Sequence, residues 1–317
     1  MGGWFRRART NQVIFFRLMP RRIPELPFRS NIQDKGSLGF EILQLADLFA
    51  RETRGELKNP LGVPARLGFH AVYVGLQGEG QHVIDFTRCP LGAGFLTVSA
   101  RGRVQQFVRD RSVNAWMVLF SPEFIDVGAA KADPLRRSRL LSPTWSPPAL
   151  AIAGPARRDI LALCERMNEE FRRPVDGLQA AVLASLVRLL VLQGERLLNE
   201  ADAPAGRRPH STTLERLFEA IEEDHAKTRS VAHYARRAGL SPRRLAELLE
   251  EHGYSNAKQL ICDRVVLEQK RLLAYGDHGL KELADLTGFE DATNLVKFFR
   301  RHVGLTPIAF RRRLQTQ

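Results

Sequence analysis

The sequence has very few cysteines: only Cys89, Cys164 and Cys262 occur in 317 residues, and they lie far apart. Disulfide-stapled folds and structural zinc sites need several cysteines at short, regular spacings. The sequence therefore predicts neither a disulfide framework nor a cysteine-bound metal. It is typical of a protein of the reducing cytoplasm.

Long apolar runs are also lacking. No run approaches the roughly 18 residues that a membrane-spanning helix needs. Near the start, the apolar segment Val13–Phe16 is short and is followed by Arg17, which is not the pattern of a secretory signal peptide. A His-x-His pair, which could hold a metal together with a glutamate, does not occur. We therefore expect no membrane partner, no metal or other cofactor and no catalytic residue, and we do not expect an enzyme.

Positive charge is in excess, with 48 Lys and Arg against 35 Asp and Glu and a formal net charge of +13. Such an excess favours a nucleic acid or an anionic membrane as partner, without choosing between them. Residues 1–30 hold seven arginines and one acid, whereas residues 207–317 hold 20 basic and 15 acidic residues. We interpret 1–30 as a flexible basic arm or the product of a wrongly assigned start codon. Contact of this arm with an anionic surface or a nucleic-acid backbone is the alternative.

Residues 60–125 carry short apolar runs, rich in β-branched and aromatic residues, which Gly and Pro separate. This pattern predicts four to seven strands in a small sandwich or barrel. Residues 131–155 contain five prolines, which remove backbone donors and predict an irregular connection. Residues 31–150 are therefore expected to form a β domain.

Helical spacing begins after this connection. Apolar residues recur three or four apart in 156–173 and again in 178–199, which predicts a helical hairpin within 151–200. Its second arm is apolar on more than one face and so needs more than one partner surface. Packing on the β domain and a homodimer interface both remain open. The small residues and prolines of 201–211 predict a linker.

Two segments in the C-terminal part resemble each other. Residues 231–253 and 280–304 share, in order, a small residue, a glycine, an apolar residue, a helix cap and a second apolar helix. This is the order of a helix-turn-helix, whose second helix enters the major groove of DNA. The matching residues lie 49 apart before the second helix and 50 apart within it: Ala235 and Ala284, Gly239 and Gly288, Leu240 and Phe289, Leu245 and Leu295, Leu248 and Phe298, Leu249 and Phe299.

One residue is thus inserted at the second turn, ahead of its predicted cap, Asp291; the first cap is Ser241, followed by Pro242. Between the segments, residues 255–277 have an apolar face that predicts one helix of about 20 residues. At 1.5 Å per residue this helix would span roughly 30 Å, close to one turn of B-DNA. Two recognition helices could then enter successive major grooves on one face of the duplex.

Residues 271–313, RLLAYGDHGLKELADLTGFEDATNLVKFFRRHVGLTPIAFRRR, closely follow the signature of the AraC/XylS family of bacterial transcription regulators. The resemblance extends over 212–314, and we take 212–317 as a DNA-binding domain of this type. More loosely, residues 69–125 resemble the family's cupin-like effector-binding domain.

The resemblance implies an α+β protein of two domains. The N-terminal one is a β-sandwich or cupin-like domain with the helical hairpin, and the C-terminal one is all-α with two helix-turn-helix units. Promoter DNA and RNA polymerase are the implied partners, with activation expected and repression as the alternative. A homodimer in the cytoplasm, associated with the nucleoid, is implied as well.

The second helix of each unit carries the predicted DNA contacts. With its leucines and phenylalanines facing the core, its polar residues face the groove, where Arg suits guanine, Asn suits adenine and Glu accepts from the cytosine amino group. The family's base-contacting positions fall on Arg243, Arg244, Glu247, Thr293, Asn294 and Lys297. Phosphate contacts, which position without specifying sequence, are predicted for Ser241, Arg300, Arg301 and Arg311.

The first recognition helix departs from the family at its acidic end, Glu247, Glu250 and Glu251, where family members often carry Lys or Arg. Carboxylates repel phosphates. The first unit is therefore predicted to bind more weakly, or to need a particular cytosine contact, and the second unit to read the bases.

A pocket for a small-molecule effector is predicted in the N-terminal domain. Its expected lining is Phe69, Tyr73, His82 and Arg103, with core packing as the alternative for Phe69. His82 is expected at a turn or rim rather than as a metal ligand. A ligand-independent regulator is one alternative. An enzyme is another, but a metal-dependent cupin would need the missing His cluster, and a DNA-repair methyl acceptor fused to the same domain would need clustered cysteines.

Overall fold

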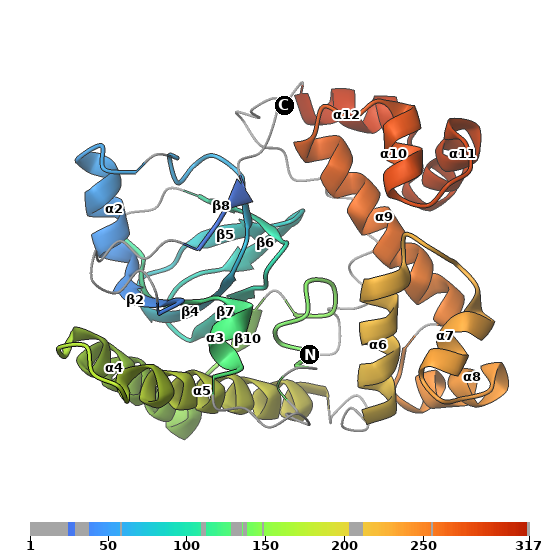
Figure 1. Ribbon diagram of the computed structural model, residues 1–317. Helices are drawn as coiled ribbons and strands as arrows, with labels where there is room; N and C mark the ends of the chain where they lie inside the picture. The colour runs from blue at the N-terminus through green and yellow to red at the C-terminus, as the bar shows by residue number, and fades with distance from the viewer. Residues whose placement is uncertain are drawn as a thin grey trace. The chain divides into compact units, whose positions relative to one another are not determined.

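The computed structural model describes residues 25–28, 38–57, 59–108, 112–127, 135, 138–147, 149–202, 212–254 and 256–315 (Figure 1). Contacts separate the chain into one unit comprising Pro24–Leu198 and a second that includes Asn199–Gln317. The predicted basic arm, 1–30, lies outside the described residues except for 25–28. Most of the predicted linker, 201–211, also lies outside them, and residues 201 and 202 end a helix instead.

The first unit contains two five-stranded sheets. One has the order β1-β3-β8-β5-β6 and the other β10-β7-β4-β9-β2. Strand β1 pairs with β3 in parallel, and every other described pair is antiparallel. The strands are β1 (Glu25–Leu26), β2 (Phe40–Gln44), β3 (Ala65–Leu67), β4 (His70–Gln77), β5 (Gln81–Ile84), β6 (Thr87–Pro90), β7 (Phe95–Ser99), β8 (Val104–Phe107), β9 (Asn114–Phe120) and β10 (Ala149–Ala151).

Strand β4 lies at the centre of its sheet and is buried on both faces. Side chains alternate along a strand, so Ala71 and Tyr73 point to one face while Val72 and Val74 point to the other. All four are buried. Tyr73 belongs to the core cluster that includes Phe107 of the other sheet, and the two valines belong to a second cluster. One face of this sheet is therefore covered by the other sheet and the opposite face by helices.

Helices α4 (Gly154–Arg172) and α5 (Gln179–Asp202) supply that helical cover and lie side by side along the sheet (Figure 1). Ile160, Met167 and Val187 are buried in the same cluster as the β4 valines. Helices α2 (Leu45–Thr53) and α3 (Pro122–Ile125) complete the unit's described helices.

The prediction of an irregular connection over 131–155 is wrong at its end. Residues 149–151 form β10, which pairs with β7 at the sheet edge, where few backbone donors are needed. Pro155 lies in the first turn of α4, where its missing N–H has no helical partner to lose.

The second unit is helical throughout the residues described. Together with the first unit it makes the protein α+β with two domains, as predicted. No described helix is both long enough and apolar enough to cross a membrane. The helices are α6 (Thr212–Asp224), α7 (Val231–Arg237), α8 (Pro242–Glu251), α9 (Ala257–Tyr275), α10 (Leu280–Leu286), α11 (Ala292–Val303) and α12 (Pro307–Gln315).

Candidate nucleic-acid interface

The two helix-turn-helix units have the same turn. The amide of Leu240 donates to the carbonyl of Ala235 over 2.8 Å, and the amide of Phe289 donates to the carbonyl of Ala284 over 2.9 Å. The glycine before each donor is left-handed, with φ of +77° in the first unit and +70° in the second. A left-handed glycine followed by this hydrogen bond ends α7 and α10 in the same way. Residues 49 apart thus share one conformation, which confirms the repeat seen in the sequence.

The two recognition helices, α8 and α11, also begin in the same way. The Ser241 hydroxyl accepts from the amide of Arg244 over 3.2 Å, and the Asp291 carboxylate accepts from the amide of Asn294 over 2.7 Å. Each bond satisfies an amide that has no partner within its helix. The caps lie 50 apart, so Glu290 is the extra residue of the second turn.

Helix α9 joins the two helix-turn-helix units; we count α6, which packs on α7, with the first unit and α12, which packs on α11, with the second. Its 19 residues extend about 28 Å at 1.5 Å per residue. Near its middle, Arg264 donates to Glu222 of α6 over 2.8 Å. At its end, Arg311 of α12 donates to the carbonyls of Leu273 and His278, over 3.3 and 2.6 Å. These contacts attach α9 to helices of both units, so the distance between α8 and α11 depends on α9.

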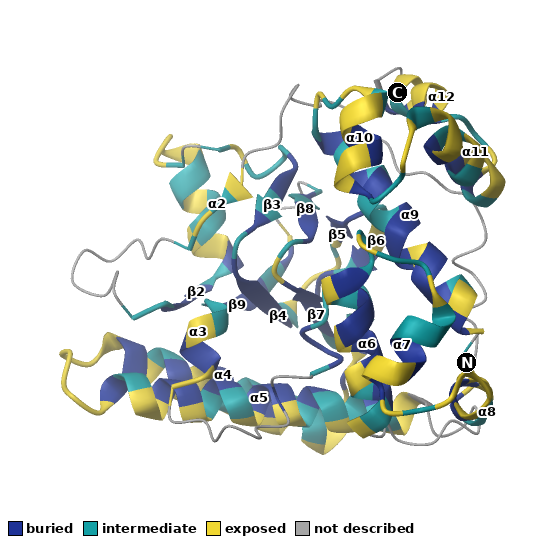
Figure 2. Ribbon diagram, turned by 45° about the vertical axis from the view of Figure 1, so that its right-hand side comes forward, coloured by how far each residue is buried: buried dark blue, intermediate teal, exposed yellow. Residues whose placement is uncertain are grey.

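Helix α8 presents a face of ion pairs to solvent. Its Leu245, Leu248 and Leu249 are buried, as expected, and its opposite face is exposed (Figure 2). The Glu247 carboxylate lies 3.2 Å from Nε of Arg243 and 3.2 Å from Nη1 of Arg244. Arg244 also pairs with Glu251 over 3.1 Å, and its hydrogen bonds to both acids raise its pKa. Glu247 and Glu251 of the predicted acidic end are therefore paired with the arginines that were expected to read bases.

Helix α11 presents a more basic face. Its Leu295 and Phe299 are buried, and the predicted contact residues Thr293 and Lys297 are exposed (Figure 2). Within the described part of the chain, Lys297 takes part in no ion pair, and no acid lies between 292 and 303.

The Asn294 amide, also exposed, has a fixed orientation. Its Nδ2 donates to Oδ2 of Asp291 over 2.8 Å, while its backbone amide donates to Oδ1 of the same carboxylate. One amide hydrogen is thus occupied by the cap, and the carbonyl oxygen and the second hydrogen remain for a base edge.

The predicted phosphate-binding residues differ in exposure. Arg300 and Arg301 are exposed in the last turns of α11. Arg311 is only partly exposed, because its guanidinium binds the carbonyl of Leu273 in α9 and that of His278 beyond its end. The Ser241 hydroxyl is occupied as an acceptor at the cap of α8.

Sequence reasoning missed the polar contacts that hold the first helix-turn-helix unit together. Asp224, at the end of α6, is buried and accepts from Lys227 and His233 over 2.8 Å each and from Arg237 over 2.9 Å. The bonds to Lys227 and His233 contribute most to lowering the pKa of Asp224 to about 2. An acid followed by basic residues at scattered spacings gives no pattern in the sequence, because the contacts depend on the angle between α6 and α7.

In the N-terminal unit, Pro24–Leu198, the prediction of His82 at a turn or rim is wrong. His82 lies in β5 and is fully buried, with its ring stacked on Phe107 at 4.5 Å between centroids and edge-on to Tyr73 at 4.8 Å. Strand alternation points it between the two sheets. Neither ring nitrogen has a hydrogen-bond partner among the described residues. Burial lowers the pKa of His82 to about 3, so the ring is neutral at pH 7.

The other predicted pocket residues are buried too. Tyr73 donates its hydroxyl proton to Gln105 over 2.7 Å, and Phe69 packs edge-on against Phe28 in the core. The structure therefore brings Tyr73 and His82 together, while Phe69 has the core position given as its alternative.

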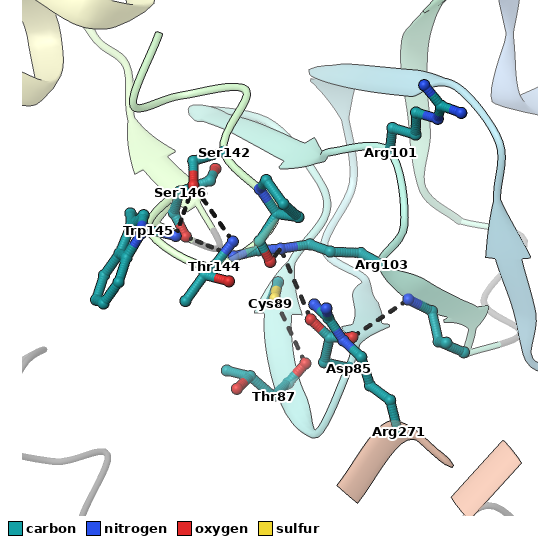
Figure 3. A network of polar contacts seen from close by, with 12 residues as sticks. Asp85, Thr87, Cys89, Arg101, Arg103, Ser142, Thr144, Trp145, Ser146 and Arg271 are labelled. Carbon is teal, nitrogen blue, oxygen red and sulfur yellow. Dashed lines mark hydrogen bonds and ion pairs between the residues drawn. The ribbon is translucent and has the colours of Figure 1, made fainter. Parts of the chain in front are cut away.

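Arg103 binds a neighbouring segment of the chain (Figure 3). Its Nε donates to the carbonyl of Pro143 and its Nη2 to that of Ser146, each over 2.9 Å. The Asp85 carboxylate lies 3.6 Å from Nε and also accepts from the amide of Val104. These contacts hold the segment before β10 against the sheet.

Comparison with known proteins identifies the helical unit. Residues 234–313 match the family described as a helix-turn-helix domain. The regulator RipA of Corynebacterium glutamicum is 29% identical over 164 residues, which are 51% of this chain and 46% of RipA. The activator RhaS of Salmonella arizonae is 25% identical over 150 residues, 47% of this chain and 51% of RhaS. The chain thus spans about half the length of these relatives.

Two solved structures match parts of the chain at low TM-scores. Fatty-acid-bound ToxT of Vibrio cholerae covers 76% of this chain and 86% of its own, with 13% identity and a TM-score of 0.36. The DNA-bound domain of AdpA covers 33% of this chain and 95% of its own, with 29% identity and a TM-score of 0.30. The chain thus carries a C-terminal helix-turn-helix domain of the AraC type and is similar there to DNA-binding transcription regulators of the AraC/XylS family.

Proposed function

We propose that this protein binds one promoter sequence as a homodimer, in the cytoplasm and on the nucleoid, and activates transcription through contact with RNA polymerase. The observation that carries the proposal is the pair of helix-turn-helix units with equal turns and equal caps, whose recognition helices bury their apolar side and expose their polar side. Such helices fit successive major grooves when they lie about one duplex turn apart. Activation, rather than repression, is proposed by likeness to RhaS, which is named an activator.

The base contacts are assigned to the exposed residues of α8 and α11. On α11, Asn294 and Lys297 supply an oriented amide and a cation that can reach adenine and guanine edges, with Thr293 beside them. On α8, Arg243, Arg244 and Glu247 are paired with one another, so binding there must break or share those ion pairs. Phosphate contacts are assigned to Ser241, Arg300, Arg301 and Arg311. We infer that the second unit contributes most of the sequence specificity.

Substitution at Lys297 tests this assignment. Lys297→Ala is expected to weaken binding to the selected duplex about tenfold, since a lost base contact costs about 1–3 kcal/mol. Glu247→Ala is expected to change affinity by about threefold or less, because it removes a carboxylate that repels phosphates as well as a potential cytosine contact. The probe is the duplex that the full-length protein enriches from a random-sequence library, and affinities are measured by titration at fixed salt.

The matched control is Lys281→Ala, which removes an exposed lysine from α10, outside the proposed contacts. A base contact predicts that Lys297→Ala relaxes the preference at one position of the duplex, whereas a phosphate contact predicts an equal loss on all sequences and a smaller salt dependence. A larger loss for Glu247→Ala than for Lys297→Ala would contradict the proposal. Failure of the wild-type protein to enrich any sequence would contradict sequence-specific binding itself.

We further propose that the N-terminal unit, Pro24–Leu198, binds a small polar effector between its sheets. Its support is the buried, neutral ring of His82, whose two nitrogens lack partners among the described residues. A neutral imidazole can donate one hydrogen bond and accept one, and an unsatisfied buried polar group is costly unless a ligand completes it. Tyr73, in edge-on contact with the ring, is the neighbouring polar side chain.

His82→Phe tests the effector site. Without ligand, the variant is expected to keep or raise the melting temperature, because an aromatic ring of similar shape replaces an unsatisfied polar one. In a thermal-shift screen of small metabolites, any compound that stabilises the wild-type protein is expected to lose its effect on the variant. A marked fall in the ligand-free melting temperature would show that the nitrogens already have a structural partner. A compound that stabilises both proteins equally would place its site elsewhere.

The homodimer is assigned to the exposed side of α5. Val182, Leu189 and Leu192 are each about two-fifths exposed there, and Leu178, just before the helix, is 71% exposed. Residues 182 and 189 lie seven positions apart, as do 178, 185 and 192. An interval of seven residues is typical of a helix that packs along a second helix. This apolar side belongs to a helix whose other side already packs on the sheet. We propose that a second copy of the same helix covers it.

A further inference from the structure

The connection between α6 and α7, which belongs to the first helix-turn-helix unit, contacts the turn of the second. Arg229 donates through Nη2 to the carbonyl of Thr287 over 2.8 Å and to that of Gly288 over 2.7 Å. Ala226 lies so close that a Cβ added to Gly288 would be 1.8 Å from its carbonyl oxygen. We call this contact, of Ala226 and Arg229 with Thr287, Gly288 and Phe289, the inter-unit bridge.

The Arg229 guanidinium also contacts aromatic rings of the second unit. Its central carbon lies 3.7 Å from the centre of the Phe289 ring and 5.8 Å from that of Phe298. Phe289 follows the turn glycine, and Phe298 belongs to the recognition helix α11. A planar cation over an aromatic face is attracted by the ring's electron density, and the attraction strengthens when the cation is partly removed from water, as Arg229 is. One side chain of the first unit therefore contacts both the turn and the recognition helix of the second.

Helix α9 alone would leave the relative angle of the units adjustable. It fixes a distance along its axis, but small changes at its two ends would swing one recognition helix against the other. The bridge is a second connection, to one side of α9. It is itself attached to α9, because Lys258 in the first turn of that helix donates to the backbone carbonyl of Arg229 over 3.0 Å. The two units and α9 thus form a closed set of contacts.

We propose that Arg229 is a positioning residue that fixes the angle between α8 and α11, and thereby makes the protein require one spacing between the two elements of its operator. This inference rests on the proposed binding of both units to one duplex. Each inserted base pair moves the second element by about 3.4 Å and rotates it by about 35°. A rigid pair of units cannot follow that displacement, whereas a pair joined by α9 alone can.

The test compares duplexes that differ by one base pair between the two elements. The parent is the duplex that the full-length wild-type protein enriches from a random-sequence library. The wild-type protein is expected to lose about tenfold in affinity on insertion, within the usual range of coupling between sites, and Arg229→Ala about threefold or less. Arg229→Lys, which keeps the charge but not the planar fork, is expected to fall between them. Arg166→Ala removes an arginine from the exposed side of α4 and is expected to match the wild-type protein on both duplexes.

The ratio of the two affinities separates positioning from general weakening. A purely structural role for Arg229 would weaken binding to both duplexes equally, and an unchanged ratio would overturn the proposal, as would a wild-type protein indifferent to spacing. Circular dichroism tests whether Arg229→Ala is folded. If that variant is not folded, Arg229→Lys supplies the comparison.

A measurement on the free protein keeps this inference separate from DNA binding. Spin labels at Glu250→Cys on α8 and Lys281→Cys on α10 report the distance between the units, since the native cysteines are buried. A narrow distance distribution that broadens in Arg229→Ala supports the bridge, and distributions of equal width refute it. If no duplex is enriched at all, the proposed function fails, and this measurement still decides the bridge.

Discussion

Gly288→Ala is expected to lower the free energy of unfolding by about 3 kcal/mol or more, combining left-handed strain with forced overpacking. Gly288 has φ of +70°, a conformation in which a Cβ is strained. The added carbon would also lie 1.8 Å from the carbonyl oxygen of Ala226, which is backbone and cannot rotate away. Urea unfolding of the full chain, followed by circular dichroism, measures the change.

Gly239→Ala is the matched control, because it occupies the same position in the first repeat. Its φ is +77°, yet nothing lies within 4 Å of an added Cβ. Only the conformational strain remains, and the expected loss is about 1 kcal/mol. Equal losses at the two glycines would show that the approach of Ala226 can be relieved without cost. A clearly larger loss at Gly288 than at Gly239 would show that the second turn is held from outside its own helix-turn-helix unit.

Leu189→Glu with Leu192→Glu is expected to convert a dimer into a monomer at micromolar concentration. Burial of a whole exposed leucine contributes roughly 1.5–3 kcal/mol, and only about two-fifths of each side chain remains to be buried. A symmetric interface counts each substitution twice, so the dimer should lose about 2–5 kcal/mol of apolar burial, and the four buried carboxylates should weaken it further. The folded monomer should persist, since both side chains are about two-fifths exposed. Sedimentation equilibrium measures the assembly, and unfolding measures the monomer.

Val127→Glu supplies the control, because Val127 is an exposed apolar residue of the same unit outside α5. It should leave the sedimentation of the wild-type protein unchanged. The double variant should also lose affinity for any operator that two copies occupy together, while its affinity for a single site stays the same. A wild-type protein that sediments as a monomer at all concentrations would leave α5 without the proposed partner.

The helical unit was readable from the sequence because its signals are local. A small residue, a glycine and a cap within eight positions determine a helix-turn-helix, as Ala235, Gly239 and Ser241 illustrate. The insertion at Glu290 was visible for the same reason. In the β unit, the position of His82 depended on register, since a shift of one residue moves a side chain to the other face of its sheet. Its place between two aromatic rings could not be inferred from the order of residues alone.

By itself the sequence determined the class of the protein and which side of each recognition helix faces outward, because turns, caps and helical periodicity depend on neighbours within a few residues. The tertiary structure decided which of those outward residues are already paired. Arg244 was expected to face a base and does face outward, but it pairs with Glu247 and Glu251, whereas Lys297 meets no acid along its helix. The tertiary structure also decided that Arg229 reaches the second turn, 58 residues along the chain at Thr287. Contacts between residues so far apart depend on the angles at which helices pack, and no local pattern of residues encodes those angles.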